Sequence, residues 1–391
     1  MDQIEMIREH APCFVYDREE IVMACNQLKT ALPEFDFLYS VKANPFDPVV
    51  RLIADTGFGA DAASPAEVEK ALISGVKPED IYYSAPGKTE KDIRRTLGKC
   101  TIIADSLREL ELIERIGEEK AMGIKAGIRV HPGFAMQGKA GASKFGIDME
   151  QLPELKKVIS RCAHVRICGI HIHLQSQILN SRILIEYYNN VMETALLLSR
   201  ECGTALEFIN FGSGIGIVYN DRDEQPVDLQ MLRGGCEGLI RKNRSTGARL
   251  LMETGRFVTC RAGKYYTPVL DKKVSHGKTY LIVSSGLNGF MRTSLASMLD
   301  LVSGGRELPG MEPLYTAPDA FQVKVIGQNH ECETVDIVGN LCTSMDVIAR
   351  SVCVKKAEPG DLVEISNAGS YGMTLSPLLF AGHRLPEELL L

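Results

Sequence analysis

Short apolar runs alternate with amphipathic stretches between residues 37 and 253. Eight of these runs are typical of buried strands, and they lie at residues 37–41, 59–61, 81–85, 101–104, 126–130, 168–173, 206–211 and 250–253. Most are separated by helix-like patterns, at residues 64–74, 89–97, 106–117, 181–200 and 228–242. Eight strands alternating with helices favour a (β/α)8 barrel, like that of the TIM-barrel enzymes. A doubly wound open sheet is the alternative, and it fits less well because no glycine-rich dinucleotide fingerprint opens an early helix.

Two of the expected helices have a marked beginning. Ser64 is followed by Glu67, and Ser106 is followed by Glu109. At this spacing the hydroxyl accepts the N–H of the third helical residue, while the glutamate reaches back to the N–H of the capping residue. We therefore expect both helices to begin with capping boxes.

The pattern changes after Arg256. Strand-like segments joined by Gly, Asn and Asp turns, without long helices, follow at residues 264–274, 278–284, 320–326, 333–338, 351–355 and 361–365. A similar segment lies at residues 13–17 and is expected to pair with this part of the chain. We predict a barrel over residues 20–260 and a β-rich domain built from residues 1–19 and 261–391, which is a normal size for a unit with its own core.

Composition narrows the class of protein. With 391 residues and 45% hydrophobic content, the chain can bury a large core in two domains. The net charge is −6 and no basic patch is present, which argues against nucleic acid as a partner. Eleven scattered cysteines without a CxxC pair favour a reduced, intracellular protein. The polar N-terminal residues and the lack of a long apolar stretch predict neither a secretory signal nor a membrane span, so we expect a cytoplasmic protein.

Chemically useful side chains stand where the barrel strands end, which is where barrel enzymes place their working residues. They are Lys42, Asp61, Arg129, His173, the turn 212–216, and Glu253 followed by Gly255 and Arg256. Most lysines at strand ends simply reach water. A desolvated lysine, however, loses its proton readily, and its neutral amine forms a Schiff base with an aldehyde. Six strand ends that agree favour a site over a coincidence.

The turn GSGIG and Arg256 together are suited to an anion. Glycines at Gly212, Gly214 and Gly216 let backbone N–H groups approach a phosphate closely, although such a turn is often only structural. Arg256 adds a fork that matches phosphate, while a surface ion pair is the commoner fate of an arginine.

Two further residues suggest a heteroaromatic cofactor. Alternation places His171 and His173 on one face of their strand. Zinc would need further ligands at suitable spacing, which are absent from the sequence, so a structural histidine or a flat imidazole packed on an aromatic ring remains. Glu253 ends the last strand, and a carboxylate beside a pyridine nitrogen keeps that nitrogen protonated. This role suits carbanion chemistry on pyridoxal phosphate.

The motifs YSVKAN, GADAAS, SKFG, HIHLQSQ, FGSGIG, ETGR, VGNLCTSMD and NAGSYG follow one another along nearly the whole chain. In this order they resemble the alanine-racemase-like pyridoxal-phosphate enzymes (fold type III), and within them the ornithine/diaminopimelate/arginine decarboxylase family. The resemblance implies a pyridoxal-phosphate-dependent carboxy-lyase. Racemases of this fold place an arginine at the ring nitrogen and use a tyrosine as a second base, so Glu253 favours decarboxylation. A racemase and a catalytically dead, decarboxylase-like regulator remain alternatives.

The resemblance also implies a role for each matched residue. Lys42 would hold the cofactor covalently, His173 would stack on its ring and Glu253 would pair with the ring nitrogen. The remaining cofactor contacts would be Asp61, Arg129, Ser176, Gly212, Ser213, Gly214, Gly255, Arg256 and Tyr371. Cys342 of the partner subunit would donate a proton to the substrate carbon, so that a homodimer builds two shared sites. Lys144 and Asp346 resemble the ion pair that crosses such a dimer.

Arg292, Cys342, Thr343 and Tyr371 are expected to contact the substrate, and near these residues the match departs in part from the family. Diaminopimelate decarboxylases carry a glutamate after the cysteine and ornithine decarboxylases an aspartate, where this chain has Thr343. Arg292 of the RPxxY segment is kept, but Ala296 replaces its tyrosine. We therefore expect a substrate with a carboxylate-bearing or amide-linked tail, of the siderophore-precursor type (citrate joined to a diamino acid) or linked to a carrier. Diaminopimelate itself is the alternative.

Overall fold

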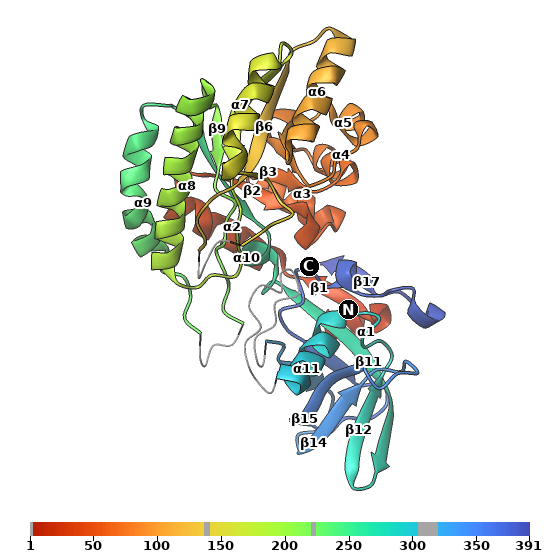
Figure 1. Ribbon diagram of the computed structural model, residues 1–391. Coiled ribbons are helices and arrows are strands. Elements are labelled where there is room, and N and C mark those ends of the chain that lie inside the picture. Colours follow the sequence, from red (N-terminus) through yellow and green to blue (C-terminus); the bar gives the residue numbers. More distant parts are fainter. Residues whose placement is uncertain (1–2, 137–140, 220–223, 304–319) are drawn as a thin grey trace. The chain divides into compact units, whose positions relative to one another are not determined.

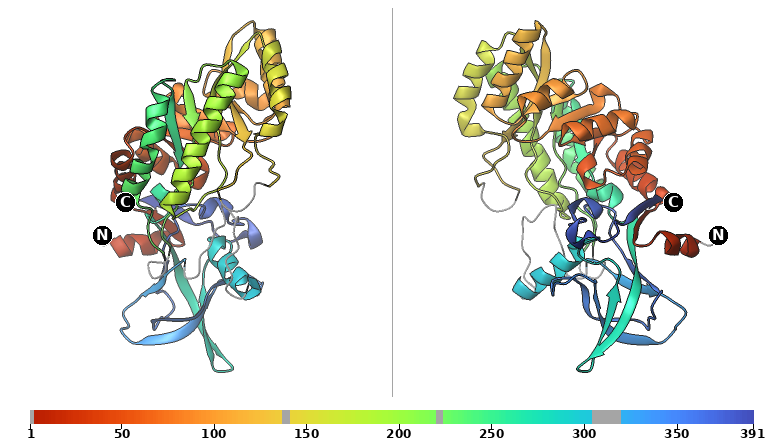
Figure 2. Two further views of the ribbon diagram at one scale, coloured as in Figure 1. Left: turned by 60° about the vertical axis from the view of Figure 1, so that its left-hand side comes forward. Right: turned by 90° about the vertical axis from the view of Figure 1, so that its right-hand side faces the viewer.

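The computed structural model describes residues 3–136, 141–219, 224–303 and 320–391 of the chain (Figures 1 and 2). Parts of both expected domains, residues 1–2, 137–140, 220–223 and 304–319, therefore lie outside the described residues. The chain divides into two compact units. One comprises Val22–Ile217 with Pro226–Gly255, and the other comprises Met1–Ile21, Val218–Gln225 and Arg256–Leu391. The short segment Val218–Gln225 was expected in the barrel and instead groups with the β-rich unit.

The first unit is built around a closed barrel of parallel strands, as the sequence predicted. The strands are β2 (Asp36–Ser40), β3 (Gly59–Ala62), β4 (Ile81–Ser84), β5 (Thr101–Ala104), β6 (Ile124–His131), β8 (Val165–His171), β9 (Phe208–Asn210) and β10 (Arg249–Thr254). Each pairs with the next in this order, and β10 pairs with β2 to close the ring, with Leu251 opposite Asp36. A short extra strand, β7 (Ile147–Asp148), pairs with β6.

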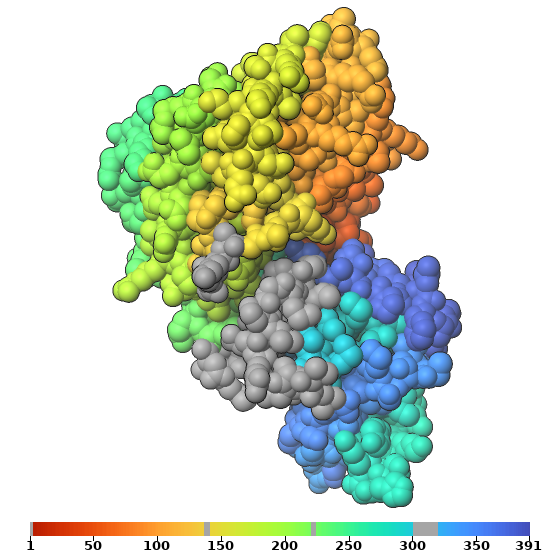
Figure 3. Space-filling view, viewed as in Figure 1, coloured from red at the N-terminus to blue at the C-terminus, as the bar shows by residue number. Residues whose placement is uncertain are grey.

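Helices surround this barrel. They are α2 (Arg18–Ala31), α3 (Asp47–Asp55), α4 (Pro65–Ile73), α5 (Glu90–Thr96), α6 (Leu107–Lys120), α7 (Leu152–Arg161), α8 (Ser181–Cys202) and α9 (Leu229–Asn243), with short 3-10 turns η1 (Val41–Ala43), η2 (Pro78–Asp80) and η3 (Met149–Gln151). The side chains of α7 and α8 make up much of the visible face of this unit in Figure 3. None of the helices in the described part of the chain is long and apolar enough to cross a membrane.

The helix beginnings follow the expected caps in part. Ser64 accepts the N–H of Glu67 and Ser106 accepts that of Glu109, both at 3.2 Å. The reciprocal half of each capping box was wrong, because both glutamates bond one residue earlier. Glu67 accepts the N–H of Ala63 at 2.7 Å, and Glu109 accepts that of Asp105 at 2.9 Å. Each glutamate thereby fixes the residue that follows a barrel strand.

The interior of the barrel is filled by apolar side chains. Leu38, Tyr82, Ile103, Cys168, Phe208 and Leu251 form one buried cluster. The ring of Phe208 occupies space that two glycines leave open, since a Cβ at Gly169 would lie 2.2 Å from it and one at Gly127 would lie 2.8 Å away. With the interior closed in this way, only the strand ends are left to build a site.

The second unit is rich in strands, again as predicted. Its strands are β1 (Cys13–Tyr16), β11 (Gly263–Ser275), β12 (Lys278–Val283), β13 (Val323–Ile326), β14 (Cys332–Val338), β15 (Val347–Lys355), β16 (Leu362–Ile365) and β17 (Glu387–Leu390). The main sheet has the order β13-β16-β11-β12-β14-β15. As expected, β1 pairs with this sheet, lying antiparallel to β11, and it also pairs with the C-terminal strand β17.

The expectation that this unit lacks long helices was wrong. Helix α11 (Met291–Ser303) follows β12, and the unit also contains α1 (Gln3–His10), α10 (Arg256–Thr259) and the 3-10 turns η4 (Met373–Leu375) and η5 (Phe380–Gly382). Arg292 at the beginning of α11 is fully buried, together with Thr293 and Ser294. A polar helix beginning that is buried gives no clear apolar stripe, and for this reason the hydrophobic pattern did not reveal the helix.

Candidate active site

Lys42 projects from η1, the turn that directly follows β2. Its Nζ lies 2.8 Å from Oδ2 of Asp61 on the neighbouring strand β3. The hydroxyls of Ser40 and Ser84 donate to the same carboxylate at 3.0 and 2.8 Å. Burial raises the pKa of Asp61, but Lys42 and the two hydroxyls outweigh this and hold that pKa below its ordinary value. The amine is therefore held in place by an ionised, completely buried partner.

Gly255 allows the chain to pass close to the turn that carries Lys42. A Cβ at this position would lie 2.6 Å from Cβ of Ala43 and 3.3 Å from Cβ of Ser40. Real Cβ atoms do not approach so closely, so any other residue would push the turn away. A glycine is therefore needed at position 255 of the ETGR motif so that the turn carrying Lys42 can keep its position.

Glu253 is buried near the end of β10 and is oriented by a neighbour that sequence reasoning missed. Asn210 on β9 donates its Nδ2 to Oε1 of Glu253 at 2.9 Å, while its own oxygen accepts the N–H of Gly212 at 2.9 Å. Burial, and after it Asp61, raise the pKa of Glu253 to about 7 against the opposing effects of Lys42, Arg129 and Asn210. Such a carboxyl can hold or release a proton near neutral pH.

His173 lies just beyond β8 and is packed against the glycine turn. Gly212 has a φ of +58°, and a Cβ there would lie 2.3 Å from Nδ1 of His173. Burial, with Arg129 and Lys42 nearby, lowers the pKa of His173 to about 3, so the imidazole is neutral. Its Nε2 lies 3.4 Å from Oγ of Ser176. Within the described residues, Nδ1 has no hydrogen-bond partner.

The two loops that follow β8 and β9 are joined to each other. Ile178 donates its N–H to the carbonyl of Gly214 at 2.8 Å, and Gly216 donates to the carbonyl of Ile178 at 3.0 Å. Gly214 has a φ of +84°, which side chains rarely adopt. The hydroxyl of Ser213 helps to stabilise this turn, because it accepts the N–H of Ile215 at 3.1 Å. Ser176 and Gly214 are therefore carried by one fixed layer of backbone.

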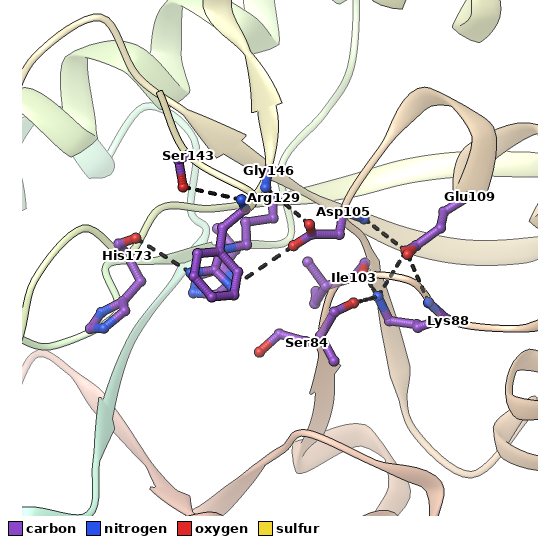
Figure 4. A network of polar contacts seen from close by, with 12 residues as sticks. Ser84, Lys88, Ile103, Asp105, Glu109, Arg129, Ser143, Gly146 and His173 are labelled. Atoms are coloured by element: carbon purple, nitrogen blue, oxygen red, sulfur yellow. Dashed lines mark hydrogen bonds and ion pairs between the residues drawn. The ribbon is translucent and has the colours of Figure 1, made fainter. Parts of the chain in front are cut away.

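Arg129 on β6 is held by a buried network that Figure 4 shows. Its guanidinium lies 3.8 Å from Asp105, donates to the carbonyl of His173 at 3.4 Å, and stands 4.5 Å from the centre of the Phe145 ring. Asp105 also accepts the N–H of Gly146 at 3.0 Å, which fixes the SKFG segment. Arg129 thus has one restricted orientation beside His173.

The same network continues to a second buried pair in Figure 4. Lys88 donates to Glu109 at 2.9 Å and to the carbonyls of Ala85 and Ile103 at 2.6 Å each. Because Glu109 also accepts the N–H of Asp105, the ends of β4 and β5 are tied together. Every donor of this lysine is used within the structure, so Lys88 is a structural residue.

In the β-rich unit, two arginines share one tyrosine hydroxyl. Arg256 donates to the hydroxyl of Tyr219, and Arg292 donates to it at 3.0 Å. Burial raises the pKa of Tyr219 to about 12, although both arginines oppose this. Arg256 also stands 5.2 Å from the centre of the Tyr371 ring, and Arg292 donates to the carbonyl of Ser370 at 3.0 Å. Tyr219 was not among the expected site residues.

Cys342 and Thr343 lie in a loop that Asp346 organises. The buried carboxylate of Asp346 accepts the N–H groups of Leu287 at 2.6 Å and Leu341 at 2.9 Å. Thr343 accepts the N–H of Met345 at 3.3 Å, and the thiol-bearing residue Cys342 is exposed. Both oxygens of Asp346 are thus bonded within its own chain, and the cross-dimer pair with the exposed Lys144 stays a prediction.

The expected site residues of the barrel gather at its strand ends, whereas Arg256, Arg292, Cys342, Thr343 and Tyr371 belong to the β-rich unit. Two missed residues left a signal in the sequence. Asn210 is a polar residue at the end of an apolar strand, and Tyr219 lies three residues after the glycine turn. Their partners, Glu253 and the two arginines, are distant in the sequence, so only the folded chain reveals the contacts.

The side chains at the barrel mouth fit pyridoxal phosphate. A lysine amine beside a buried carboxylate, a neutral imidazole with an unpartnered nitrogen, and a buried carboxyl with a pKa of about 7 match the aldehyde, the flat ring and the pyridine nitrogen of this cofactor. The class defined by fold and site is a barrel enzyme that uses pyridoxal phosphate.

Comparison with known proteins agrees with this class. Residues 18–260 match the family described as "Pyridoxal-dependent decarboxylase, pyridoxal binding domain". The chain belongs to this family, so its cofactor is pyridoxal phosphate and its reaction is the decarboxylation of an amino acid. The resemblance found in the sequence is thereby confirmed, and a carboxy-lyase is favoured over a racemase or an inactive regulator.

Individual relatives cover nearly the whole chain. An L-glutamyl-[BtrI acyl-carrier protein] decarboxylase from Niallia circulans is 29% identical over 100% of this chain and 92% of its own length. A diaminopimelate decarboxylase from Helicobacter pylori is 28% identical over 95% of this chain and 88% of its own. The crystal structure of diaminopimelate decarboxylase from Helicobacter pylori complexed with L-lysine has a TM-score of 0.83, at 25% identity, and the match covers 99% of this chain and 94% of that one.

Proposed function

We propose that this decarboxylase acts on an amino acid whose tail is linked to a larger group, rather than on free diaminopimelate or ornithine. The larger group is a carrier protein or a citrate of the siderophore-precursor type. One observation carries the proposal. At residue 343, where the related decarboxylases place an acidic residue that reads an amino group of the substrate, the hydroxyl of Thr343 accepts the N–H of Met345.

The missing acid weakens the binding of a substrate with a free distal charge. Leaving a buried charged group without its partner costs on the order of 2–5 kcal/mol. A linked tail has an amide or thioester in place of that charge and loses nothing at Thr343. The relative from Niallia circulans, whose name specifies a carrier-linked glutamyl substrate, supports this class of tail without defining it.

Arg292 is a proposed contact of the substrate's tail, but it already donates hydrogen bonds within its own unit. Its side chain is fully buried, and it donates to Ser370 and Tyr219 within its own unit. A carboxylate on the tail would have to exchange with one of these two acceptors. An amide-linked tail without a carboxylate needs no such exchange.

The proposed roles in the reaction follow from the contacts of each residue. Lys42 holds the cofactor aldehyde, and Asp61 orients its amine. When bound, pyridoxal phosphate would supply an electron-poor ring for the electron pair left on Cα by the departing CO2. Glu253 would hold a proton at the ring nitrogen, the neutral His173 would pack against the ring, and Arg129 would support the Lys42 side.

The cofactor phosphate and the final proton are assigned to further residues. Ser176 and the turn 212–214 (Gly212, Ser213 and Gly214), together with Gly255, Arg256 and Tyr371, are the proposed cofactor contacts on the phosphate side. Cys342 of the partner subunit is the proposed proton donor to Cα. Its exposed thiol, on a loop fixed by Asp346, is consistent with a homodimer that shares its sites.

A substrate screen tests the proposal. Purified enzyme loaded with pyridoxal phosphate is offered diaminopimelate, ornithine, lysine, arginine, citryl-diaminopropionate and glutamate linked to an acyl-carrier protein. CO2 release and the product mass are recorded for each. We expect turnover of a linked substrate at least about tenfold faster, in kcat/KM, than of any free amino acid, which corresponds to roughly 1.4 kcal/mol. Efficient turnover of free diaminopimelate would contradict the proposal.

A further inference from the structure

His171 is a buried histidine that none of the proposed roles uses. It is the last residue of β8 and is 1% exposed. Its Nε2 lies 3.1 Å from Oε1 of Glu253. In the described part of the chain, neither ring nitrogen makes a hydrogen bond of good geometry. A polar ring buried without such bonds is costly, which points to a purpose beyond packing.

The contacts of Glu253 are divided unequally between its two oxygens. Asn210 donates to Oε1, and its orientation is fixed because its own oxygen accepts the N–H of Gly212. His171 faces the same oxygen. Both neighbours therefore lie on the Oε1 side of the carboxyl, and Asn210 is hydrogen-bonded to that oxygen.

The charge state of His171 limits what it can do there. Burial lowers the pKa of His171 well below its ordinary value, and Arg129, His173, Lys42 and Lys88 lower it further. A neutral imidazole has one N–H, and an ionised carboxylate only accepts. The tautomer with the hydrogen on Nε2 can donate to Oε1, whereas the other would bring two lone pairs together.

We propose that His171 is a positioning residue for Glu253: its Nε2, already 3.1 Å from Oε1, turns its N–H onto that oxygen when the cofactor binds, so that Oε2 is presented to the ring nitrogen. The groups that act on Glu253 besides His171 are Asp61, Lys42 and Arg129, with Asn210 as a hydrogen-bond donor. The inference rests on the proposed role of Glu253 at the ring nitrogen. Its two tests are chosen so that the two ideas can fail separately.

The first test measures the tautomer in the wild-type protein. The protein, loaded with pyridoxal phosphate, is labelled with ¹⁵N-histidine, and His171→Gln serves only to assign the resonances of residue 171. We expect a neutral ring protonated at Nε2 from about pH 6 to pH 8. A ring protonated at Nδ1 only, or a charged ring in this range, would overturn the inference.

The second test compares two variants of similar shape, His171→Gln and His171→Met. Glutamine keeps a donor at the distance of Nε2, whereas methionine fills the space without one. The dissociation constant of pyridoxal phosphate is measured against pH by absorbance. Losing a hydrogen bond to a charged group should move the acidic midpoint of binding up by about one to two pH units in His171→Met. His171→Gln should stay near the wild type.

Glu253→Gln separates the inference from the role on which it rests. If this variant binds pyridoxal phosphate with the wild-type pH dependence, the proposed role of Glu253 fails. If it changes the pH dependence while both His171 variants match the wild type, only the role of His171 is overturned. Should His171→Met fail to fold, as judged by circular dichroism, the tautomer measured in the wild-type protein decides the question.

Discussion

Two carboxyls at the barrel mouth are driven in opposite directions by their surroundings. Asp61 is completely buried, but Lys42 and two hydroxyls hold its pKa low, whereas burial raises the pKa of Glu253 to about 7. The difference lies in their partners, because Asp61 faces an amine at 2.8 Å and Glu253 faces an amide and a neutral imidazole. One carboxylate is thereby a permanent anchor and the other can exchange a proton.

Glu253 should make the ligand-free protein less stable as the pH rises. A carboxyl whose folded pKa is raised binds more protons when folded, so stability falls between its ordinary value of 4.5 and about 7. This interval, at about 1.4 kcal/mol per pH unit, corresponds to ~3 kcal/mol. We expect the difference in unfolding free energy between Glu253→Gln and the wild type to grow in favour of the variant by about this amount from pH 4.5 to pH 8. Urea unfolding of the ligand-free protein at the two pH values measures it.

Glu237→Gln serves as the matched control for this measurement. Glu237 is an exposed residue of α9 that faces Arg241. The unfolding free energy of Glu237→Gln should stay within about 0.5 kcal/mol of the wild-type value at both pH values, as is usual for surface substitutions. A Glu253→Gln gain that does not depend on pH would mean that the carboxyl is not strained by its burial.

Thr343 is expected to control the choice of substrate. In Thr343→Glu the loop gains an acid next to Cys342 and loses the bond to the N–H of Met345, which is worth about 0.5–1.5 kcal/mol. We expect kcat/KM for diaminopimelate to rise about tenfold or more and that for a linked substrate to fall. Thr343→Ala, which removes the same bond without adding charge, should show no gain. Equal behaviour of both variants would refute the assignment.

At the scale of elements, the turn η1 depends on the close approach of Gly255. Gly255→Ala would place a Cβ 2.6 Å from Ala43 and so displace the turn that carries Lys42. We expect a loss of about 1–3 kcal/mol in unfolding free energy, typical of overpacking, and a reduced content of covalently bound cofactor. Denaturant unfolding and absorbance of the borohydride-reduced protein measure the two effects.

A glycine in open space provides the comparison. Gly234 lies in α9, and an added Cβ there meets nothing within 4 Å. Gly234→Ala should therefore be neutral or stabilise the helix by up to about 1 kcal/mol. If Gly255→Ala bound cofactor as well as Gly234→Ala does, the steric argument for the ETGR glycine would be wrong.

A comparison of the expected with the observed helices and strands shows what the hydrophobic pattern can predict. The eight barrel strands lie within a few residues of their expected positions, because a buried parallel strand is a short, continuous apolar run between turns. Helices α2, α3 and α7 were not among the expected elements, and α11 was expected to be absent. Site residues at strand ends were identified from their positions, whereas Asn210 and Tyr219 were missed because their partners come from distant segments.

At the scale of the whole molecule, the proposed homodimer predicts which chain supplies each residue of a site. If Cys342 of the partner subunit completes each site, then Lys42 and Cys342 of one site come from different chains. Asp346 fixes the loop of Cys342 within its own chain, through the N–H groups of Leu287 and Leu341, so the thiol is presented without help from the partner.

Mixing two inactive variants tests whether Lys42 and Cys342 of one site come from different chains. Lys42→Ala and Cys342→Ala should each be nearly inactive. When equal amounts are unfolded together and refolded, half of the dimers are mixed, and each mixed dimer has one complete site only if Cys342 acts across the interface. Activity should then recover to about a quarter of the wild-type value, by random pairing in a two-fold symmetric dimer. If the cysteine acts within its own chain, every site in the mixture contains one defect and no activity returns. Refolded Lys42→Ala alone is the control, and recovery in the mixture without dimers in sedimentation would contradict the shared site.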